Sequence, residues 1–442
     1  MTAPKIIVIG AGMAGLSAAW RLTRAGVDVT VYEKSSRVGG RVFTDIVNGT
    51  MAEAGAQFIA NFYSNTRRII RDIGLQDEVI PIAGHSGIVR DGHLFELRYD
   101  VRSALSPLIG TMSKIKLARV LPQLITHWSN LDIHALNRAH GIDTANLAEY
   151  SHRQLDSDVL EHLLEPVLSG MFYWTPEETS QAMLFILLKA GAGMRLLTIR
   201  GGLGRLPSEI AKSLNIQLNE QVVEVELVDS GRYVCRVATR DGEIDQFADG
   251  IVCSIPALEV PRLFADLESP DRAFFERVTY SSTVSVQIGV NQRMPQAVYG
   301  IFFPRREPQT RYLAAATVES AKYPMQSPSN RDVVGLFSSD LAARKLRGND
   351  QDFILSALLA DLGQLGSAYT LDRAQLFHRG YDWAPAVPHF GAGYFRRLNA
   401  FKDRQMGRRR VVFAGDYLGG PFIEGAVTSG LDAADQLLRQ LS

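Results

Sequence analysis

The feature that most constrains this chain is a glycine-rich loop near its N-terminus, placed between an apolar run and a helical pattern. Lys5 to Ile9 is a β-branched run typical of a buried parallel strand, and Gly10-Ala11-Gly12-Met13-Ala14-Gly15 follows it directly. We expect a helix over Leu16 to Arg24 and a second strand over Val27 to Tyr32, which ends at Glu33. This order predicts a Rossmann-like βαβ unit, and therefore an α/β fold with a parallel sheet.

Each position of the loop suits the binding of a dinucleotide. The first glycine makes the tight turn, the second lets a pyrophosphate approach the backbone, and the third lets helix and strand pack closely, while the first N–H groups of the helix face the phosphates. Glu33 follows Gly15 by 33 − 15 = 18 residues, where a carboxylate accepts both hydroxyls of an adenosine ribose. An isolated loop of this kind is more often only a turn, so the surrounding elements carry the prediction. The candidate cofactor-binding residues of this unit are Gly10, Gly12, Met13, Ala14, Gly15, Glu33 and Lys34.

A second glycine pair follows in Arg37-Val38-Gly39-Gly40-Arg41. Two glycines let the chain pass close beneath a cofactor, and the Arg41 guanidinium offers a fork of donors to a pyrophosphate. With this motif the sequence resembles the amine-oxidase branch of FAD enzymes, which includes protoporphyrinogen oxidases, phytoene-type desaturases and monoamine oxidases. The resemblance implies bound FAD and a substrate-binding domain inserted into the FAD-binding domain.

Two further segments match parts of this family that contact FAD. The segment Ala52 to Phe58 looks like the stretch that passes the flavin ring. Gly201 to Pro207 resembles a G-G-x-x-x-L-P helix start, and the strand expected over Gln221 to Val228 is similar to the one whose backbone meets the adenine. The resemblance thereby assigns cofactor contacts to Gly39, Gly40, Arg41, Gly55, Ala56, Gln57, Phe58 and Val223, with Val222 as the alternative to Val223.

The C-terminal part supplies the last cofactor segment. A strand is expected over Arg410 to Ala414, and it leads into Gly415 and Asp416, where the family places an acid beside the ribityl and pyrophosphate groups. Gly419 to Val427 resembles the segment in which a helix N-terminus points at the pyrimidine end of the flavin, although Gly-Gly-Pro can also simply start a helix. The implied contacts are Gly415, Asp416, Phe422, Ile423, Glu424 and Ala426.

These segments predict a discontinuous organisation in two domains. The FAD-binding domain takes residues 1–60, 200–260 and 400–442, and the inserted α+β substrate-binding domain takes residues 61–199 and 261–399, with a helical part at 100–195. The other expected elements are helices over Asn65 to Ile73, Ser113 to His127, Asp158 to Val167 and Glu424 to Leu441, a hairpin over Tyr233 to Cys253 around Asp241-Gly242, and an alternating strand over Thr283 to Val290.

Composition and charge exclude several other classes of protein. The 47 Lys and Arg balance 47 Asp and Glu, which disfavours a nucleic-acid binder or a polybasic membrane protein. The longest unbroken apolar run, Ala182 to Leu188, is far shorter than the ~20 residues of a membrane-spanning helix. Two cysteines, Cys235 and Cys253, cannot form a disulfide framework, so we expect a cytoplasmic protein in which both are small buried residues. The nine histidines show no metal-ligand spacing, so no metal site is expected.

The motifs also indicate the direction of electron flow. Only one complete dinucleotide motif is present, so we expect the flavin to take a hydride from an organic substrate and to pass the electrons to oxygen or another acceptor. Amine oxidases of the family usually carry a lysine on the strand that matches Thr283 to Val290 and a tyrosine where Phe422 stands, and neither is present here. Three stretches instead look like protoporphyrinogen oxidases: Asp91 to Leu94, Glu165 to Gly170 and Trp383 to Pro388.

We therefore expect an FAD-dependent oxidoreductase that dehydrogenates an apolar or ring-shaped small molecule at a C–C or C–N bond, in the manner of protoporphyrinogen oxidases. The alternatives are an amine or amino-acid oxidase, and a flavin-free carrier such as the Rab GDP-dissociation inhibitors. No protein base is assigned. The candidate substrate contacts are Arg102, aligned with the family's anchor for a propionate, and His389, Tyr394 and Phe422; the first three are as readily explained as ordinary exposed or packed residues.

Residues 103–128 form an amphipathic pattern with apolar positions that include Leu105, Met112, Ile115 and Leu121. Such a face is usually part of a core. In this family the alternatives are the mouth of an apolar tunnel and a peripheral contact with a membrane. The sequence leaves these three open, and it does not define the oligomeric state.

Overall fold

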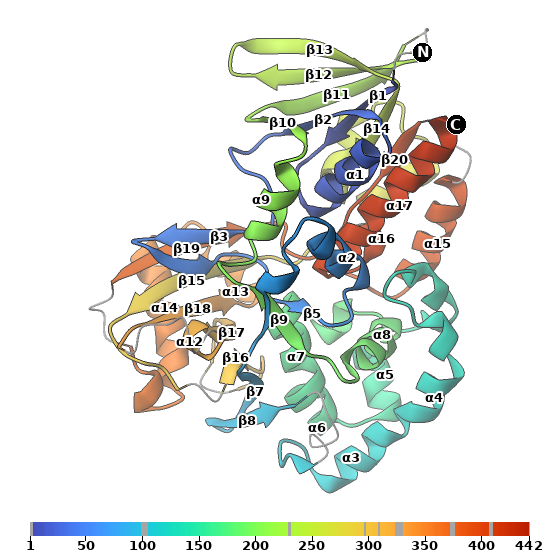
Figure 1. The fold of residues 1–442 in the computed structure, drawn as a ribbon. Coiled ribbons are helices and arrows are strands. Elements are labelled where there is room, and N and C mark those ends of the chain that lie inside the picture. Colours follow the sequence, from blue (N-terminus) through green and yellow to red (C-terminus); the bar gives the residue numbers. More distant parts are fainter. Residues whose placement is uncertain are drawn as a thin grey trace.

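The computed structural model describes residues 3–98, 105–228, 231–295, 298–307, 310–322, 330–371, 376–405 and 410–441. Within these ranges the chain forms a parallel sheet with its helices, a larger mixed sheet, and a lobe of helices beside the mixed sheet (Figure 1). The first and last helices, α1 (Met13–Arg24) and α17 (Ile423–Leu441), pack against each other. None of the helices in these ranges is long and apolar enough to cross a membrane.

The parallel sheet collects five strands from four separated parts of the chain. Ile7 in the central strand pairs with Thr30 on one side and with Ile251 on the other. Alternate residues of this strand enter two different cores, since Ile6 and Val8 pack toward α1 and α17 while Ile7 packs on the opposite face. In order across the sheet the strands are β10 (Asn215–Leu218), β2 (Asp28–Glu33), β1 (Lys5–Ile9), β14 (Gly250–Cys253) and β20 (Val411–Phe413).

Helices α1 (Met13–Arg24) and α17 (Ile423–Leu441) cover one face of this sheet. They approach so closely that a Cβ added at Gly430 would lie 2.1 Å from the carbonyl oxygen of Ala14. α1 begins three residues before the expected Leu16, because Gly12 in an extended conformation accepts the first helical hydrogen bond from the Leu16 N–H at 2.9 Å. Two shorter helices, α2 (Ser64–Asp72) and α9 (Arg205–Ala211), pack alongside (Figure 1).

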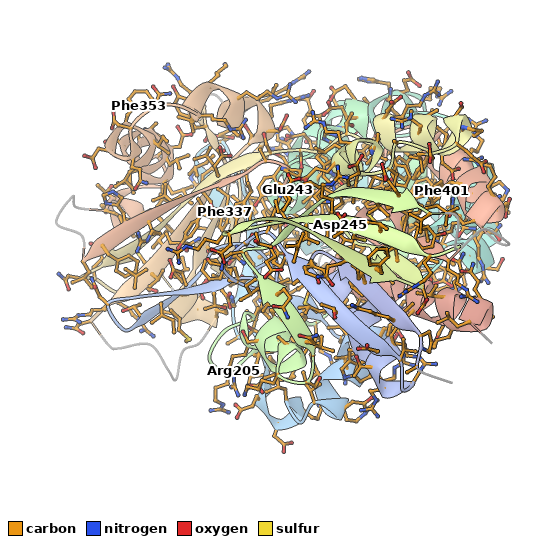
Figure 2. All side chains as sticks on the ribbon, turned by 90° about the horizontal axis from the view of Figure 1, so that it is seen from above. Arg205, Glu243, Asp245, Phe337, Phe353 and Phe401 are labelled. Carbon is orange, nitrogen blue, oxygen red and sulfur yellow. The ribbon has the colours of Figure 1, made fainter. Side chains whose placement is uncertain are left out.

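A three-stranded antiparallel sheet sits beside the parallel sheet, and Figure 2 shows it from above, with Glu243 and Asp245 on its outer strand. Its strands are β11 (Gln221–Leu227), β12 (Tyr233–Thr239) and β13 (Gly242–Ala248). The expected hairpin through Cys253 is wrong in its last part, because β14 leaves this sheet and pairs in parallel with β1. All four residues of β14 are buried, which favours the centre of a sheet over a hairpin edge. Cys235 and Cys253 are both buried and free.

The mixed sheet has seven strands and is covered on both faces. Helices α13 (Asp340–Leu346) and α14 (Gln351–Gly363) pack on one face, and α7 (Glu165–Phe172) packs on the other. As a result all eight residues of β15 are buried. The strand expected over Thr283 to Val290 is confirmed, and its alternation separates the two buried faces of the sheet. In order the strands are β19 (Phe377–Trp383), β15 (Thr283–Val290), β18 (Asp332–Ser338), β17 (Leu313–Val318), β16 (Val298–Phe302), β7 (His85–Arg90) and β8 (His93–Leu97).

The helical lobe lies within residues 111–191. The helix expected over Ser113 to His127 is two helices that meet at Arg119, and Pro122 lies in the first turn of the second, where its missing N–H is tolerated. A π-helical turn, Leu160–Leu164, joins α6 to α7, so the helix expected over Asp158 to Val167 is part of a longer helical path. Besides α7, the helices are α3 (Thr111–Ala118), α4 (Val120–Thr126), α5 (Leu147–Gln154), α6 (Ser157–Val159) and α8 (Gln181–Gly191).

Short elements connect these parts. The strand pair β3–β4 follows the second glycine motif, and β9 pairs with both β5 and β6. The remaining elements are β3 (Thr44–Val47), β4 (Thr50–Glu53), β5 (Ile59–Ala60), β6 (Val79–Pro81), β9 (Leu196–Ile199), α10 (Val260–Leu263), α11 (Ser269–Glu276), α12 (Glu319–Lys322), α15 (Tyr394–Gln405) and α16 (Asp416–Gly419).

Candidate functional site

The loop after β1 lies against the second glycine motif. Gly10 has a φ of +98°, a left-handed conformation that favours glycine, and its N–H donates to the carbonyl of Tyr32 at 2.8 Å. Gly12 forms a parallel bridge with Gly39, whose N–H donates to the carbonyl of Ala11 at 2.8 Å. The two glycine motifs therefore form one layer of backbone at the carboxyl ends of β1 and β2, where ligands of parallel sheets bind.

The glycines of this layer differ in what surrounds them. A Cβ at Gly15 would lie 2.0 Å from the carbonyl oxygen of Gly10, so the helix packs too closely on the loop for any side chain. A Cβ at Gly12 would meet no heavy atom within 4 Å, and a Cβ at Gly40 would meet only the Cα of Gly12, at 3.4 Å. Gly12 and Gly40 thus border open space beside the N-terminus of α1, and this space suits a pyrophosphate.

Glu33, at the end of β2, lies against the same loop. Its Oε2 accepts a hydrogen bond from the Ala11 N–H at 2.7 Å, and its Oε1 accepts one from the Ser35 N–H at 2.8 Å. A carboxylate has about four acceptor positions, so these two bonds leave capacity for ribose hydroxyls. Lys34 points elsewhere, because its ammonium pairs with Glu259 at 3.1 Å. The structure therefore brings Glu33 to the loop and directs the charge of Lys34 away from it.

Arg41 and Asp416 meet beside the glycine layer. Nη1 of Arg41 lies 2.7 Å from Oδ2 of Asp416, and Nη2 lies 3.0 Å from Oδ1. The same guanidinium donates to the carbonyl of Ala386. Burial disfavours the charge of Arg41, yet the Asp416 carboxylate raises the pKa of the guanidinium and keeps it cationic. This pair holds a fixed positive group where the first and last cofactor segments converge.

The segment Gly55 to Phe58 packs against the backbone of Arg41. A Cβ at Gly55 would lie 2.1 Å from the carbonyl oxygen of Arg41, and the Ala56 N–H donates to that oxygen at 3.0 Å. Trp383 reaches this segment from β19, and its Nε1 donates to the carbonyl of Ala54 at 2.8 Å. Trp383 was not among the predicted site residues, although the stretch that contains it was singled out.

Gln57 and Phe58 extend this segment toward the mixed sheet. Nε2 of Gln57 donates to the carbonyls of Glu53 and Gly55, both at 2.9 Å, and its buried Oε1 has no hydrogen-bond partner in the described ranges. The carbonyl of Gln57 accepts a bond from the Tyr299 hydroxyl at 3.2 Å. Phe58 packs against the apolar core of the mixed sheet. The segment thus connects the glycine layer to the mixed sheet.

The last cofactor segment folds tightly at the start of α17. The Gly415 N–H donates to Oγ of Ser429 at 2.9 Å. A Cβ at Gly419 would lie 1.9 Å from the carbonyl oxygen of Gly425, so the chain before α17 lies directly on the first turn of that helix. The Ala426 N–H donates to the carbonyl of Phe422 at 3.1 Å, which places Ile423 at the helix start. The first N–H groups of α17 have no partner within the helix and are available to a ligand.

Phe422 belongs to an aromatic cluster that reaches the helical lobe. Its ring centroid lies 6.1 Å from that of Phe62, 6.0 Å from that of Tyr63 and 5.8 Å from that of Phe172. Phe172 in turn stacks on Trp174 at 4.6 Å. The cluster forms an apolar wall between the last cofactor segment and α7.

Glu424 has a structural role that the sequence does not predict. Its carboxylate is fully buried and accepts hydrogen bonds from the N–H groups of Asn65 and Thr66, each at 2.8 Å, and from Oγ1 of Thr66 at 2.7 Å. His134 completes the set, with Nε2 at 2.7 Å from the carboxylate. The carboxylate therefore caps the N-terminus of α2, and the cofactor contact predicted for Glu424 stays a prediction. The sequence carries no local signal for this, because His134 and α2 are distant in the chain.

Val223 occupies an irregular position in β11. Val222 pairs with Val237 and Glu224 pairs with Arg236, so Val223 lies at a β-bulge with no partner in the register of β12. A bulge leaves the extra residue outside the ladder. The backbone of Val223 is therefore the part of this strand that a ligand such as adenine can use, which supports Val223 over Val222.

The surroundings of the predicted substrate residues differ. Arg102 lies outside the described residues. His389 is buried, its Nδ1 lies 3.1 Å from Oγ1 of Thr279, and burial lowers its pKa. Tyr394 packs in the core, where its hydroxyl donates to the carbonyl of Tyr417 at 2.7 Å and its ring lies 4.8 Å from that of Phe390. An aromatic cluster thus surrounds Tyr394, and a substrate contact by this residue stays a prediction.

The arrangement fits a long dinucleotide cofactor. Open space at Gly12, the Glu33 carboxylate, the Arg41–Asp416 pair, the Val223 bulge and the start of α17 belong to separate segments that meet along the carboxyl edge of the parallel sheet. By contrast, no group of three or more His, Cys, Asp or Glu residues in the described part of the chain is placed to hold a metal ion.

Comparison with known proteins decides the family. The family described as flavin containing amine oxidoreductase matches residues 13–438. The chain belongs to this family. It is therefore an FAD-dependent oxidase, and the predicted cofactor, fold class and enzyme class are confirmed. Membership also removes the alternative of a flavin-free carrier.

Some relatives of this flavin-containing amine oxidoreductase match it along nearly the whole chain. It is 22% identical to the mitochondrial protoporphyrinogen oxidase of Nicotiana tabacum, with 100% of this chain and 96% of the relative covered. It is 20% identical to the coproporphyrinogen III oxidase of Bacillus subtilis (strain 168), with 95% and 94% covered. Its fold matches that of a putative protoporphyrinogen oxidase from Exiguobacterium sp. 255-15 with a TM-score of 0.78, at 22% identity and with 100% of both chains covered.

Proposed function

We propose that this FAD-dependent oxidase acts on a porphyrinogen or a closely similar neutral ring system. The observation that carries this proposal is similarity along essentially the whole chain to two oxidases named for porphyrinogens, one from a plant and one from a bacterium. The structure adds support, because β15 carries no lysine and the aromatic wall has Phe422 where amine oxidases have tyrosine. The substrate is then a small molecule with a largely apolar surface.

We further propose that residues 1–60, 200–260 and 400–442 form the FAD-binding domain, and that residues 61–199 and 261–399 form the substrate-binding domain. All five strands of the parallel sheet come from the first set of ranges. All seven strands of the mixed sheet and helices α3–α8 come from the second set. The division thus follows the two larger sheets, and only the small sheet β5–β9–β6 among the described strands crosses it.

Each cofactor segment has a distinct task in this proposal. The loop at Gly12 and the Arg41 guanidinium would hold the pyrophosphate, Glu33 the adenosine ribose, Val223 the adenine, and the start of α17 the pyrimidine end of the flavin. When bound, FAD supplies the acceptor for a hydride from the substrate. Asp416 fixes the direction of the Arg41 guanidinium, and the wall around Phe422 excludes water from the reacting face.

Amine oxidation is the second candidate, and the charges in the structure disfavour it. The mixed sheet does hold one fully buried lysine, Lys322 at the end of α12. Its ammonium lies 3.7 Å from Glu53 and 3.6 Å from Glu319, so it forms part of a buried ionic group rather than projecting from β15. We therefore infer that Lys322 does not take the part of the lysine that the family resemblance associates with amine oxidation.

Oxygen uptake tests the proposed function. The purified holoenzyme is given protoporphyrinogen IX, coproporphyrinogen III, putrescine, benzylamine and an L-amino acid in parallel, with hydrogen peroxide and ammonia measured at the end. We expect uptake with at least one porphyrinogen and formation of the coloured porphyrin above the rate without enzyme. Turnover of amines with release of ammonia, and none of porphyrinogens, would reverse the order of the two candidates.

We also propose a peripheral contact between the helical lobe and an anionic membrane surface. The amphipathic pattern at 103–128 is only partly core, since Leu108, Val120 and Leu124 are buried while other apolar side chains are exposed. Ile125 is 71% exposed, for example. Of the 13 large apolar side chains that are exposed in the described ranges, six lie in this segment: Leu105, Met112, Ile115, Leu121, Ile125 and Trp128.

Basic side chains border this apolar surface. Lys114, Lys116 and Arg119 lie on the same two helices, and Lys189 of α8 stands over the Trp128 ring at 4.7 Å. Apolar side chains rimmed by Lys and Arg suit the interface of an anionic bilayer. Co-sedimentation with vesicles of phosphatidylcholine and phosphatidylglycerol checks this. Ile125→Glu should abolish binding, while Phe353→Glu, at an exposed position on α14 marked in Figure 2, should not. Equal binding by both variants would contradict the contact.

A further inference from the structure

Three uncharged polar side chains are buried on one face of the mixed sheet without hydrogen-bond partners. They are Ser285 and Gln287 on β15 and Thr317 on β17, and their exposed fractions are 0%, 0% and 6%. Oγ of Ser285, both amide atoms of Gln287 and Oγ1 of Thr317 have no partner among the residues that the structure describes. We call these three residues the polar row.

The register of the sheet brings the polar row together. Gln287 lies opposite Gly335 of β18, and Gly335 lies opposite Thr317 of β17. A Cβ at Gly335 would lie 2.5 Å from Oγ1 of Thr317 and 3.0 Å from Nε2 of Gln287, so both side chains converge over this glycine. Thr317 also pairs with Gly300 of β16, where an added Cβ would have only Oγ of Ser86 within 4 Å. Because Gly335 and Gly300 have no side chains, no neighbouring Cβ occupies the space beside the polar atoms of Gln287 and Thr317.

The polar row is on the side of the mixed sheet that faces the predicted cofactor segment Ala52 to Phe58. Ser285 is paired with Tyr381, and Thr283 with Trp383, so the side chains of each pair share a face. Trp383 is the residue whose indole donates to Ala54 at 2.8 Å, and its ring would lie 3.6 Å from a Cβ at Gly55. The next residues along β15 turn the other way, since Val286 packs in the core beneath α13 and α14.

Apolar groups border the polar row on the side of α7, while Arg379 of β19 is the cross-strand neighbour of Gln287. Phe337, which pairs with Ser285, belongs to the core that also contains Phe302 and the side chains of α7. Figure 2 shows Phe337 toward the middle of the molecule. Phe302 touches α7 so closely that a Cβ at Gly170 would lie 2.2 Å from its ring. The polar atoms therefore lie between the segment Gly55 to Phe58 and the aromatic side chains that contact α7.

Buried polar atoms without partners indicate a binding role here. A buried donor or acceptor left unpaired destabilises a fold by roughly 1–3 kcal/mol, so native structures pair nearly all of them with protein, water or a ligand. The polar row offers three acceptor oxygens and no charge, which matches a ligand with several neutral N–H donors. A cationic amine would find no compensating carboxylate in it.

We propose that the polar row recognises the neutral pyrrole-type N–H groups of the ring substrate, with Gln287 and Thr317 as the principal contacts. This inference rests on the proposed function and deepens it, because it names the substrate atoms that are bound and the residues that bind them. The three residues act in specificity and positioning. No bond is made or broken by them.

Gln287→Leu and Thr317→Val test the inference, with Ile288→Leu as the matched control on the opposite face of β15. Each variant is purified as holoenzyme, and its FAD content, Tm and KM for the best substrate of the oxygen-uptake panel are measured. We expect a KM about tenfold higher in Gln287→Leu, the effect of roughly one lost hydrogen bond, and unchanged FAD content. The Tm should be unchanged or higher, because an apolar side chain removes unpaired polar atoms. Thr317→Val provides the same readout if Gln287→Leu fails to fold.

Three other results have distinct meanings. Porphyrinogen turnover with the same KM in Gln287→Leu, Thr317→Val and Ile288→Leu would overturn the proposed role of the polar row in substrate recognition. It would leave the proposed function intact. A lowered Tm with unchanged KM in both variants would also overturn it, since the side chains would then have partners within the fold. Oxidation of an amine but of no porphyrinogen would remove the proposed function. In that case the Kd of protoporphyrin IX is measured by its fluorescence in the wild type and in Gln287→Leu. A higher Kd in the variant would still support recognition of the ring by Gln287, and an equal Kd would overturn it.

Discussion

Arg41 and Asp416 are 375 positions apart in the sequence and form a two-point ion pair, with N–O distances of 2.7 and 3.0 Å. The pair joins the second glycine motif to the segment before α17. It therefore fixes the orientation of the guanidinium and holds the second glycine motif in contact with the segment before α17. A cofactor that lies along the carboxyl edge of the parallel sheet needs both segments in place.

Replacement of Asp416 by Asn should weaken both the fold and the retention of FAD. The neutral amide keeps the shape of the carboxylate but leaves the partly buried Arg41 without a counter-ion. We expect a loss on the order of 1–3 kcal/mol, measured by urea unfolding, together with a raised Kd for FAD. Asp382→Asn is the control, because its pair with Arg347 is also two-pointed but exposed, and should change stability by less than about 1 kcal/mol. Equal effects in the two variants would contradict a special role for Arg41.

Glu33→Ala should lower FAD affinity by about 1.5–3 kcal/mol, the usual range for hydrogen bonds to a charged group. The variant loses the proposed ribose acceptor and also the bond from the Ala11 N–H that holds the glycine loop. Lys34→Ala is the neighbouring control, since its ammonium pairs with Glu259 and leaves the loop untouched. Titration of the apoprotein with FAD measures both. If Glu33→Ala binds FAD like the wild type, the ribose assignment fails.

Gly12 and Gly15 should respond to alanine in opposite ways. The backbone of Gly12 is open to any residue and its Cβ would meet nothing within 4 Å, so Gly12→Ala should change the stability of the apoprotein by less than about 1 kcal/mol. The new methyl group would occupy the space assigned to the pyrophosphate, and FAD affinity should fall at least about tenfold. Gly15→Ala should instead prevent folding, because its Cβ would lie 2.0 Å from the Gly10 carbonyl. A Gly12→Ala protein that binds FAD normally would contradict the position of the pyrophosphate.

The His134–Glu424 contact predicts a pH dependence of stability. The hydrogen bond to Glu424 raises the pKa of His134, so its contribution is complete below the unfolded value of about 6.5 and is lost as pH rises through the higher folded pKa. Burial opposes the charge of Glu424, yet bonds from His134 and Thr66 lower its pKa, so its contribution is lost only as pH falls through that lowered value. Tm should therefore fall in the wild type as pH rises above about 6.5 and through the raised pKa of His134. His134→Gln should flatten this slope, and an unchanged slope would contradict the contact.

Local sequence was sufficient where one short segment defines its own geometry. The order of strand, glycine loop, helix and acid predicted β1, α1 and the position of Glu33, and the strand that ends at Asp416 could be placed because ligands collect at the carboxyl ends of parallel strands. The resemblance added Arg41, which meets Asp416 in the structure. These features depend on backbone preferences within about thirty residues.

Features that depend on distant packing could not be predicted. Glu424 caps a helix more than 350 positions away, so this role is not visible in the local sequence. Tyr394 contacts Phe274 of α11, more than 100 positions earlier in the chain, as well as the nearby Phe390. The polar row depends on the register of β15, β18 and β17, and β14 follows a hairpin but joins the parallel sheet. In each case tertiary contacts determine which residues a side chain contacts or which strand another strand pairs with.

The most direct test is to add protoporphyrinogen IX without oxygen to the purified yellow protein and to follow its visible flavin absorbance. We predict that the absorbance of one FAD per chain bleaches, because each flavin takes two electrons from the porphyrinogen. Admitted air should restore the flavin spectrum, and protoporphyrin IX should then accumulate, since its formation removes six electrons and so needs three reductions of the flavin. A preparation whose flavin spectrum is unchanged by porphyrinogens but bleached by an amine would contradict the account.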